Sequence, residues 1–322
     1  MMKPETRSTI PLGEHLSKIA SSVYAVFGAL RRLCRSAPEG ETRLATVDVE
    51  MADLLKQART LLQRGKVAGI LALRREGEEA LPHLFVSAKD LQDWTPGPKW
   101  PLAKIGWRML KDRPPGKPLG IICRTCDSRA LEEHLKMHQF AENDLVRLLL
   151  PCDATQAELC ACMQPAPNHV LETRPLNPEL RAVAEADDPA GVWREHLQRC
   201  IKCYGCRNAC PACICPECRL EDPAFVPTLT LPPSPLVWHI CRALHVADNC
   251  VSCGACQDAC PAGIPLLAIH HALADHLRAN AAYQAGTRQP SPLSTAARAE
   301  GPAGMPAPEW KTCPGACARG NT

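Results

Sequence analysis

The chain has 322 residues, of which 46% are hydrophobic, so it is long and apolar enough for two domains with their own cores. Its net charge is only +3 and its basic and acidic residues are interspersed, which argues against a nucleic-acid-binding protein. The 20 cysteines are spread over too long a chain for a small secreted disulfide scaffold, so we expect a reducing compartment, the cytoplasm.

The first 45 residues are expected to form an N-terminal helical extension, with an amphipathic helix at residues 13–35. The apolar part of this helix, residues 19–30, is shorter than the roughly 20 residues that a membrane span needs. A basic pair, Arg31 and Arg32, follows it at the place where a secretory signal would have small residues and a cleavage site. We expect no membrane span, and a cryptic export signal is the alternative.

Residues 46–190 are expected to form an α/β domain. Apolar residues recur at helical spacing between Met51 and Leu62, whereas the later apolar runs are short and continuous, as in buried strands. A strand, a helix and a second strand in that order favour parallel strands with a right-handed crossover. The predicted elements are a helix at 51–62, apolar runs at 67–73 and 84–86, a strand at 118–123, a helix at 127–138 and a strand at 145–150.

Cysteines gather where the last two strands end. Cys123 and Cys126 lie at the end of the first strand and Cys152 follows the second, and the carboxyl ends of parallel strands form the ligand-binding edge of such a sheet. Cys160 and Cys162 come shortly afterwards and would supply a fourth ligand. This is our candidate for an additional iron-sulfur cluster. The alternative is that these thiols are small buried apolar residues.

Two arginines flank the start of the predicted helix in the same loop. Free backbone N–H groups at a helix start favour an anion, so Arg124 and Arg129, with Cys126 between them, are candidates to bind the phosphate of a flavin or dinucleotide. The alternative is that the arginines pair with Glu132 or Glu133. The sequence has no GxGxxG fingerprint, so a flavin site here would be of another type.

Residues 191–285 contain two identically spaced cysteine runs, each ending in a proline. Three thiolates at this spacing hold one [4Fe-4S] cluster, and the fourth characteristically holds the neighbouring cluster. Zinc is disfavoured because a zinc site has no use for a third evenly spaced thiol. We assign one cluster to Cys200, Cys203, Cys206 and Cys260, and the other to Cys250, Cys253, Cys256 and Cys210.

The long interval between the two runs favours a mainly helical, ferredoxin-like domain, since compact two-cluster ferredoxins have a shorter connection. Helices are expected at residues 237–247 and 266–277. The apolar face of the first of these is predicted to contain Val237, Ile240, Cys241, Leu244 and His245.

Three further thiols, Cys213, Cys215 and Cys218, follow the first run directly. They either ligate additional metal or line the pocket of the first cluster. His239 and His245 are expected to pack or donate hydrogen bonds and not to act as ligands. Residues 286–322 are rich in Pro, Ala and Gly without hydrophobic period, which predicts a disordered tail.

Four segments together carry a resemblance to a known family. They are GIICRTCDSRALEEHLKMHQF, VRLLLPC, RCIKCYGCRNACPACICPEC and CVSCGACQDACPAGIPL. They resemble the beta subunits of deazaflavin-reducing hydrogenases and formate dehydrogenases, and more closely the ferredoxin-containing bacterial relatives of these subunits. The resemblance extends over about residues 50–280. It implies an FAD-containing iron-sulfur subunit beside a hydrogenase, formate dehydrogenase or heterodisulfide-reductase-like partner, in which the flavin splits a hydride into single electrons.

Two functions follow as hypotheses. In the first, the chain is an oxidoreductase subunit that exchanges electrons between FAD in the α/β domain and a partner, through two [4Fe-4S] clusters. In the second, it is a flavin-free relay whose α/β domain only docks onto partner enzymes. No nucleophile with an adjacent base is recognisable, so hydrolytic chemistry is not expected.

Overall fold

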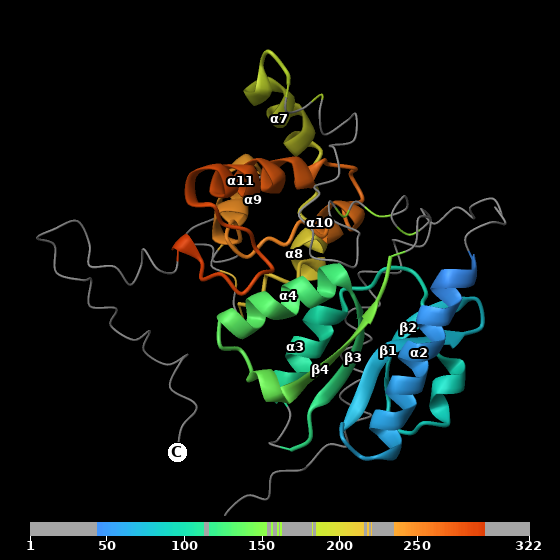
Figure 1. Ribbon diagram of the computed structural model, residues 1–322. Coiled ribbons are helices and arrows are strands. Elements are labelled where there is room, and N and C mark those ends of the chain that lie inside the picture. Colours follow the sequence, from blue (N-terminus) through green and yellow to red (C-terminus); the bar gives the residue numbers. More distant parts are fainter. Residues whose placement is uncertain are drawn as a thin grey trace, which may run out of the picture.

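The computed structural model describes residues 44–112, 116–152, 185–215 and 235–293, together with the single residues 156, 160, 162, 182, 218 and 220. It contains an α/β domain and, packed on one side of it, a helical C-terminal domain (Figure 1). The predicted helix at residues 13–35 and most of the predicted tail lie outside the described residues. None of the helices in the described part is long and apolar enough to cross a membrane.

The centre of the α/β domain is a four-stranded sheet. Its strands lie in the order β2-β1-β3-β4. β1 pairs parallel to β3, and β3 pairs parallel to β4, while β1 and β2 form an antiparallel hairpin at the edge. The bounds are Gly69–Glu76 for β1, Glu79–Phe85 for β2, Leu119–Arg124 for β3 and Leu145–Leu150 for β4. The predicted α/β class with a parallel sheet is therefore confirmed.

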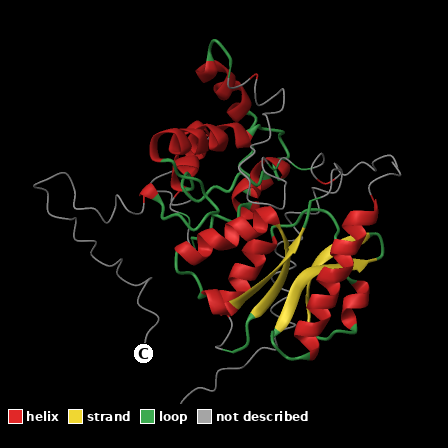
Figure 2. Cartoon of the chain, viewed as in Figure 1, coloured by secondary structure: helices red, strands yellow, loops and turns green. Residues whose placement is uncertain are grey.

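Helices cover both faces of the sheet (Figure 2). On one face, α2 (Leu44–Gln63) packs Leu54 and Ala58 into a core with Ile70. On the other face, α3 (Leu102–Asp112) and α4 (Thr125–Lys136) surround Leu71 and Ile121. Neighbouring residues of a strand point to opposite faces, so strands buried on both sides are apolar along their length, as β3 is up to Cys123.

The helix after β3 begins two residues earlier than expected. α4 starts at Thr125 directly after Arg124, whose φ of −72° and ψ of 165° are extended. Asp127 lies in the first turn, where its carboxylate accepts a hydrogen bond from the Ala103 backbone N–H at 2.9 Å. Asp127 therefore joins α4 to α3, the helix that the sequence pattern did not predict.

The C-terminal domain contains no strand within residues 185–215 and 235–293, and it is helical as expected. Two short helices each contain the third cysteine of one run, namely Cys206 in α8 and Cys256 in α10. The bounds are Pro189–Gln198 for α7, Gly205–Ala209 for α8, Pro235–His245 for α9, Ala255–Asp258 for α10 and Leu266–Ala281 for α11.

The helix α9 buries a different face from the one predicted. Its buried residues are Trp238, His239, Arg242 and Ala243, whereas Val237 and Leu244 are 53% and 55% exposed. The prediction of the apolar face was wrong because the inner face packs against cysteines and backbone carbonyls, which need cationic and hydrogen-bonding partners.

The two domains meet along α3 and α4 (Figure 1). From α3, Lys104 Nζ donates to the carbonyls of Arg207 and Cys210, at 3.0 and 3.1 Å. From α4, His134 Nε2 lies 2.9 Å from the Pro211 carbonyl. Burial lowers the pKa of His134 to about 4, so the ring is neutral and Nε2 carries the donated proton. The α/β domain thus fixes the backbone that surrounds the last cysteine of the first run.

The packed chain continues beyond residue 286, where the tail was expected to begin. The Gly286 backbone N–H donates to the buried Glu133 carboxylate, and Lys136 Nζ donates to the Gln289 carbonyl at 3.1 Å. Ser291 is also buried. Residues 286–293 therefore form a strap over α4, and the rest of the predicted tail lies outside the described residues.

Candidate metal centres

The two cysteine runs share one backbone conformation. In the first run Lys202 and Tyr204 have φ of 53° and 57°, and in the second Ser252 and Gly254 have φ of 52° and 76°. Each of these residues lies at the same offset from the first cysteine of its run. Left-handed residues are uncommon outside glycine, and repeated turns of this kind aim successive N–H groups into one concavity that suits an anionic centre. The sequence repeat therefore has a matching structural repeat.

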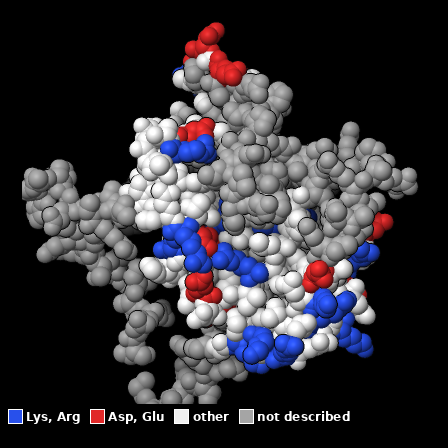
Figure 3. All heavy atoms as spheres, in the orientation of Figure 1, with Lys and Arg blue, Asp and Glu red and all other residues white. Residues whose placement is uncertain are grey.

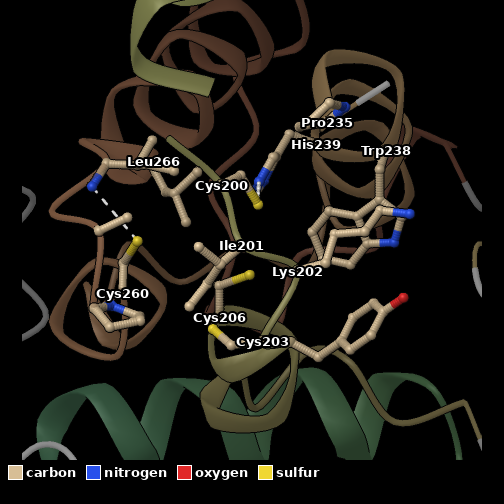
Figure 4. A pocket seen from close by; sticks show the side chains of 14 residues that line it. Cys200, Ile201, Lys202, Cys203, Cys206, Pro235, Trp238, His239, Cys260 and Leu266 are labelled. Atoms are coloured by element: carbon tan, nitrogen blue, oxygen red, sulfur yellow. Dashed lines mark hydrogen bonds between the residues drawn. The ribbon is translucent and has the colours of Figure 1, made fainter. Parts of the chain in front are cut away.

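The first set of thiols surrounds one pocket (Figure 4). This pocket is lined by Cys200, Cys203 and Cys206 of the first run together with Cys260 of the second. Ile264 N–H donates to Cys260 Sγ at 3.4 Å, and His239 Nε2 lies 3.4 Å from Cys200 Sγ. Four thiols around one apolar pocket, with N–H groups directed at sulfur, are the donor set that a [4Fe-4S] cluster uses.

The second set brings Cys210 of the first run beside Cys250, Cys253 and Cys256. Burial, together with the nearby Cys210 thiol, raises the pKa of Cys250 to about 12. Burial likewise raises the pKa of Cys253 to about 11, where Lys99 opposes the shift and Cys210 adds to it. Buried thiols of this kind stay protonated at neutral pH unless a bound metal displaces the proton. Cys210 therefore lies near the three thiols of the second run, as the predicted ligand set requires.

Arg242 on α9 lies between the two sets. Its side chain is buried, with Nη2 donating to the Cys206 carbonyl at 3.0 Å and Nη1 3.1 Å from His270 Nε2. The thiols of Cys206 in the first set and of Cys210 and Cys256 in the second are all close enough to favour its charge. A buried cation needs a negative partner. Two anionic centres, one on either side, would provide it.

The remaining candidate thiols separate into three groups. Cys123 lies in the apolar core with Leu71 and Leu131. Cys126 is in contact with Cys160 and Cys162, and all three are buried. Of the extra cysteines after the first run, Cys213 hydrogen-bonds with Cys210, Cys215 is exposed and Cys218 is partly buried.

Arg124 and Arg129 do not offer the phosphate site that the sequence suggested. Both are buried, and Arg124 Nη2 donates to the carbonyls of Pro96 and Gly97, at 3.3 and 2.8 Å. Arg129 Nη2 donates to the Val251 carbonyl at 3.1 Å and approaches Cys162 Sγ at 3.8 Å. These donors face backbone and sulfur, so they do not fit a flavin phosphate.

The glutamates that were the alternative partners pair elsewhere. Glu132 forms an ion pair with Arg147 at 2.9 Å, and Glu133 forms one with Lys136 at 2.7 Å. Arg147 and Arg288 line an open hollow of about 490 Å³ beside β4, where basic and acidic side chains lie next to one another in Figure 3. Both of these arginines pair with Glu132, so the hollow has little net positive charge.

Sequence reasoning did not single out three cations near these thiols, the partly buried Lys99 and Lys104 and the buried Arg242. Lys99 Nζ forms an ion pair with Asp258 Oδ2 at 3.0 Å and donates to the Cys253 carbonyl. A lysine next to prolines carries no local signal of such a contact. For Arg242 a signal existed, since an arginine on a strongly apolar helix is worth testing as a buried charge.

Within the described residues, no three His, Cys, Asp or Glu side chains are arranged to hold a single metal ion. The first set of thiols instead lines a pocket, and a four-iron cluster needs such a space between its ligands. The fold and these thiols define a ferredoxin-type iron-sulfur protein joined to an α/β domain. In agreement, residues 244–265 match the family model of the 4Fe-4S binding domain, so the chain has at least one iron-sulfur cluster.

Two known relatives indicate more closely which kind of iron-sulfur protein this chain is similar to. The chain is 41% identical over 94 residues to the F420-dependent formate dehydrogenase subunit beta of Methanocaldococcus jannaschii, which covers 29% of this chain and 25% of the relative. It is 44% identical over 100 residues to the F420-dependent formate dehydrogenase 1 subunit beta of Methanococcus maripaludis, covering 31% and 26%. The match thus spans about a quarter of each curated relative. The predicted resemblance to formate dehydrogenase beta subunits is confirmed over this part.

Proposed function

We propose that this chain is the electron-transfer subunit of an oxidoreductase complex and holds two [4Fe-4S] clusters in its C-terminal domain. The observation that carries the proposal is the pocket lined by Cys200, Cys203, Cys206 and Cys260, which combines three thiols of one run with the last thiol of the other. Bound by these two sets of thiols, the clusters supply one-electron redox chemistry.

The surrounding residues have definite tasks in this proposal. Arg242 balances the negative charge of both thiol sets from a buried position between them. His239, whose pKa burial lowers to about 4, is neutral and directs Nε2–H at Cys200 Sγ. Apolar residues such as Ile264 and Leu266 exclude water from the first set. Charge, hydrogen bonds to sulfur and burial are the factors by which a protein sets a cluster potential.

We propose that the chain works in the cytoplasm beside a redox partner such as a hydrogenase, a formate dehydrogenase or a heterodisulfide-reductase-like enzyme. At one end of such a complex, electrons derived from a hydride would be received or delivered. At the other end, single electrons would be exchanged. Both relatives are formate dehydrogenase subunits, which supports formate as the ultimate electron source of such a complex.

The second candidate is the flavin-free relay, and the contacts of Arg124 and Arg129 favour it. Their guanidinium groups are buried and bonded to backbone carbonyls, so they do not provide the phosphate site on which flavin binding was predicted. In this version the hydride chemistry belongs to a partner, and the α/β domain holds and positions the cysteine runs through α3 and α4.

Two measurements on the full chain, purified without oxygen in the presence of FAD, test the proposal. Cluster content is measured as iron per chain, and flavin as the fluorescence released on denaturation. At least about eight irons without flavin would support the relay, since each cluster holds four. About one flavin per chain would refute the relay and support the flavin-containing subunit. Absence of iron would refute both.

The ligand assignment has its own test. Cys253→Ser should damage the second cluster and, through the shared first run, loosen the first, so both electron paramagnetic resonance signals should change in the reduced protein. Cys241→Ser is the control, because this α9 thiol is in neither set. Unchanged signals in Cys253→Ser would refute the assignment.

A further inference from the structure

We propose that Cys210 and Cys213 form a reversible disulfide in the cluster-free protein, and that this bond removes Cys210 from the ligands of the second cluster. The two residues belong to the sequence Cys210-Pro211-Ala212-Cys213, the C-x-x-C spacing at which redox-active disulfides form. The structure brings the two thiols into contact, since their side chains hydrogen-bond with each other. The pair is therefore a candidate modification site inside one of the two thiol sets.

The backbone between the two cysteines is a tight turn that suits such a bond. The Cys213 N–H donates to the Cys210 carbonyl at 3.3 Å, which closes a four-residue turn with proline at its second position. The Cα atoms at the ends of such a turn lie within about 7 Å. Since the Cα atoms of disulfide-bonded cysteines lie about 4.4 to 6.8 Å apart, the bond needs little movement of the backbone.

Contacts from the α/β domain hold this turn in place. Lys104 Nζ donates to the Cys210 carbonyl at 3.1 Å, and His134 Nε2 lies 2.9 Å from the Pro211 carbonyl. A turn that is already ordered loses little further conformational freedom when a disulfide closes it. Cys213 is only partly buried, so a small oxidant can reach the pair from this side.

The second run provides an internal comparison. Its last cysteine, Cys260, begins a similar turn, in which the Gly263 N–H donates to the Cys260 carbonyl at 3.2 Å. Gly263 stands at the position that Cys213 occupies in the first run, and it has no thiol. Of the two cysteines exchanged between the runs, Cys210 alone has a cysteine three residues after it. We therefore expect oxidation to affect the second cluster and to spare the first.

The oxidant is a small-molecule disulfide such as oxidised glutathione, and the reaction is thiol–disulfide exchange. The partly exposed Cys213 attacks one sulfur of the oxidant, which forms a mixed disulfide and releases one molecule of glutathione. Cys210 then attacks the Cys213 sulfur, which forms the S–S bond between the two residues and releases the second glutathione. The two protons of the cysteine thiols end on the two released glutathione molecules, and excess thiol reverses both steps.

The consequence for the metal centre rests on the function proposed above. In that proposal Cys210 is the fourth ligand of the second cluster, beside Cys250, Cys253 and Cys256. A cysteine binds metal as a thiolate, and a sulfur in a disulfide is no longer one. Oxidised chains would therefore load the first cluster and not the second, until a thiol reduces the pair.

The first test uses the full chain after a chelator has removed its clusters. The chain is treated with oxidised glutathione, its remaining thiols are alkylated in denaturant, and the tryptic peptide of residues 208–219 is sequenced by mass spectrometry. We expect a disulfide between Cys210 and Cys213. Protein that retains its clusters should not form it, because iron then holds Cys210. Cys215→Ala is the matched control, since it removes an exposed thiol of the same peptide and should leave the disulfide unchanged.

The outcomes separate this proposal from the preceding one. Absence of the disulfide from the oxidised cluster-free chain, or pairing of Cys210 with Cys215, would overturn the inference and leave the two-cluster function intact. Formation of the disulfide in protein that keeps all its iron would instead overturn Cys210 as a ligand, and with it the effect on the second cluster.

The second test measures how much iron the chain takes up from a cluster-loaded donor protein without added thiol. The oxidised chain should take up about four irons fewer than the reduced chain, because one cluster holds four. Cys213→Ala should take up equal iron in both states, and Cys213→Ser replaces it if circular dichroism shows that the alanine variant is unfolded. Equal uptake by the oxidised and reduced unchanged chain, with the disulfide present, would refute the control of the second cluster.

Discussion

Replacing Arg242 with glutamine should lower the reduction potentials of both centres of the C-terminal domain. Arg242 is 3% exposed and donates to the carbonyl of Cys206, a cysteine of the first set. At an effective dielectric of about 20, a unit charge about 8 Å from a redox centre contributes about 2 kcal/mol. For a one-electron couple this corresponds to about 90 mV. The potential falls because the oxidised, less negative form depends less on the lost cation.

The assay is a redox titration followed by electron paramagnetic resonance, with Arg278→Gln as the control. Arg278 lies on α11 with its side chain 37% exposed, and it pairs with Asp275. Its removal takes away the same charge at a site that water and salt screen, so the potentials should move by only a few millivolts. Equal shifts in the two variants would refute the argument that a buried cation sets the potentials. Loss of iron in Arg242→Gln would show that the residue is needed to assemble the centres.

Three further changes test other parts of the structure. His239→Leu should lower the potential of the first cluster alone, by removing an N–H donor to Cys200, with the iron content unchanged in the same titration. His134→Gln should flatten the loss of stability between about pH 6.5 and pH 4 in urea unfolding, because the folded pKa of about 4 means that the unfolded state binds the extra proton in that range. A steep loss of stability over the same pH range in His134→Gln would contradict the assignment of this pH dependence to His134. Gly286→Ala should lower the thermal midpoint, since φ is +85° and a methyl group would lie 2.5 Å from Arg129 Cβ.

Much of the α/β domain could be predicted because the sequence patterns that determine its strands lie within short stretches of the chain. The strands at residues 118–123 and 145–150 are continuous apolar runs, and they appear as β3 and β4 with nearly the expected bounds. The helix α3 was not predicted, and prolines stand on either side of it in the sequence. Pro101 in fact stands directly before the first residue of α3, a position that suits proline because the N–H there has no helical partner.

The candidate metal centres also have one part that the sequence predicts and one part that it does not. Cysteine spacing predicts the thiol sets, because a fixed offset along the chain carries the geometry of the site. The cations could not be predicted, since Lys99 meets the Cys253 carbonyl across 154 residues of sequence. The buried face of α9 was misjudged for a related reason, as hydrophobic periodicity has no means to recognise a charged residue that faces an anionic centre.

The exchange of the last cysteines between the runs also affects how the protein is made. Cys260 lines the same pocket as Cys200, so this pocket lacks one wall until the ribosome has passed residue 260. Cys210 leaves the ribosome early and has no companions until Cys250, Cys253 and Cys256 follow. Under the two-cluster proposal, neither set of ligands would be complete on a partly made chain. Metal insertion would then be a late step, and a truncated chain would lack a full set of ligands for either cluster.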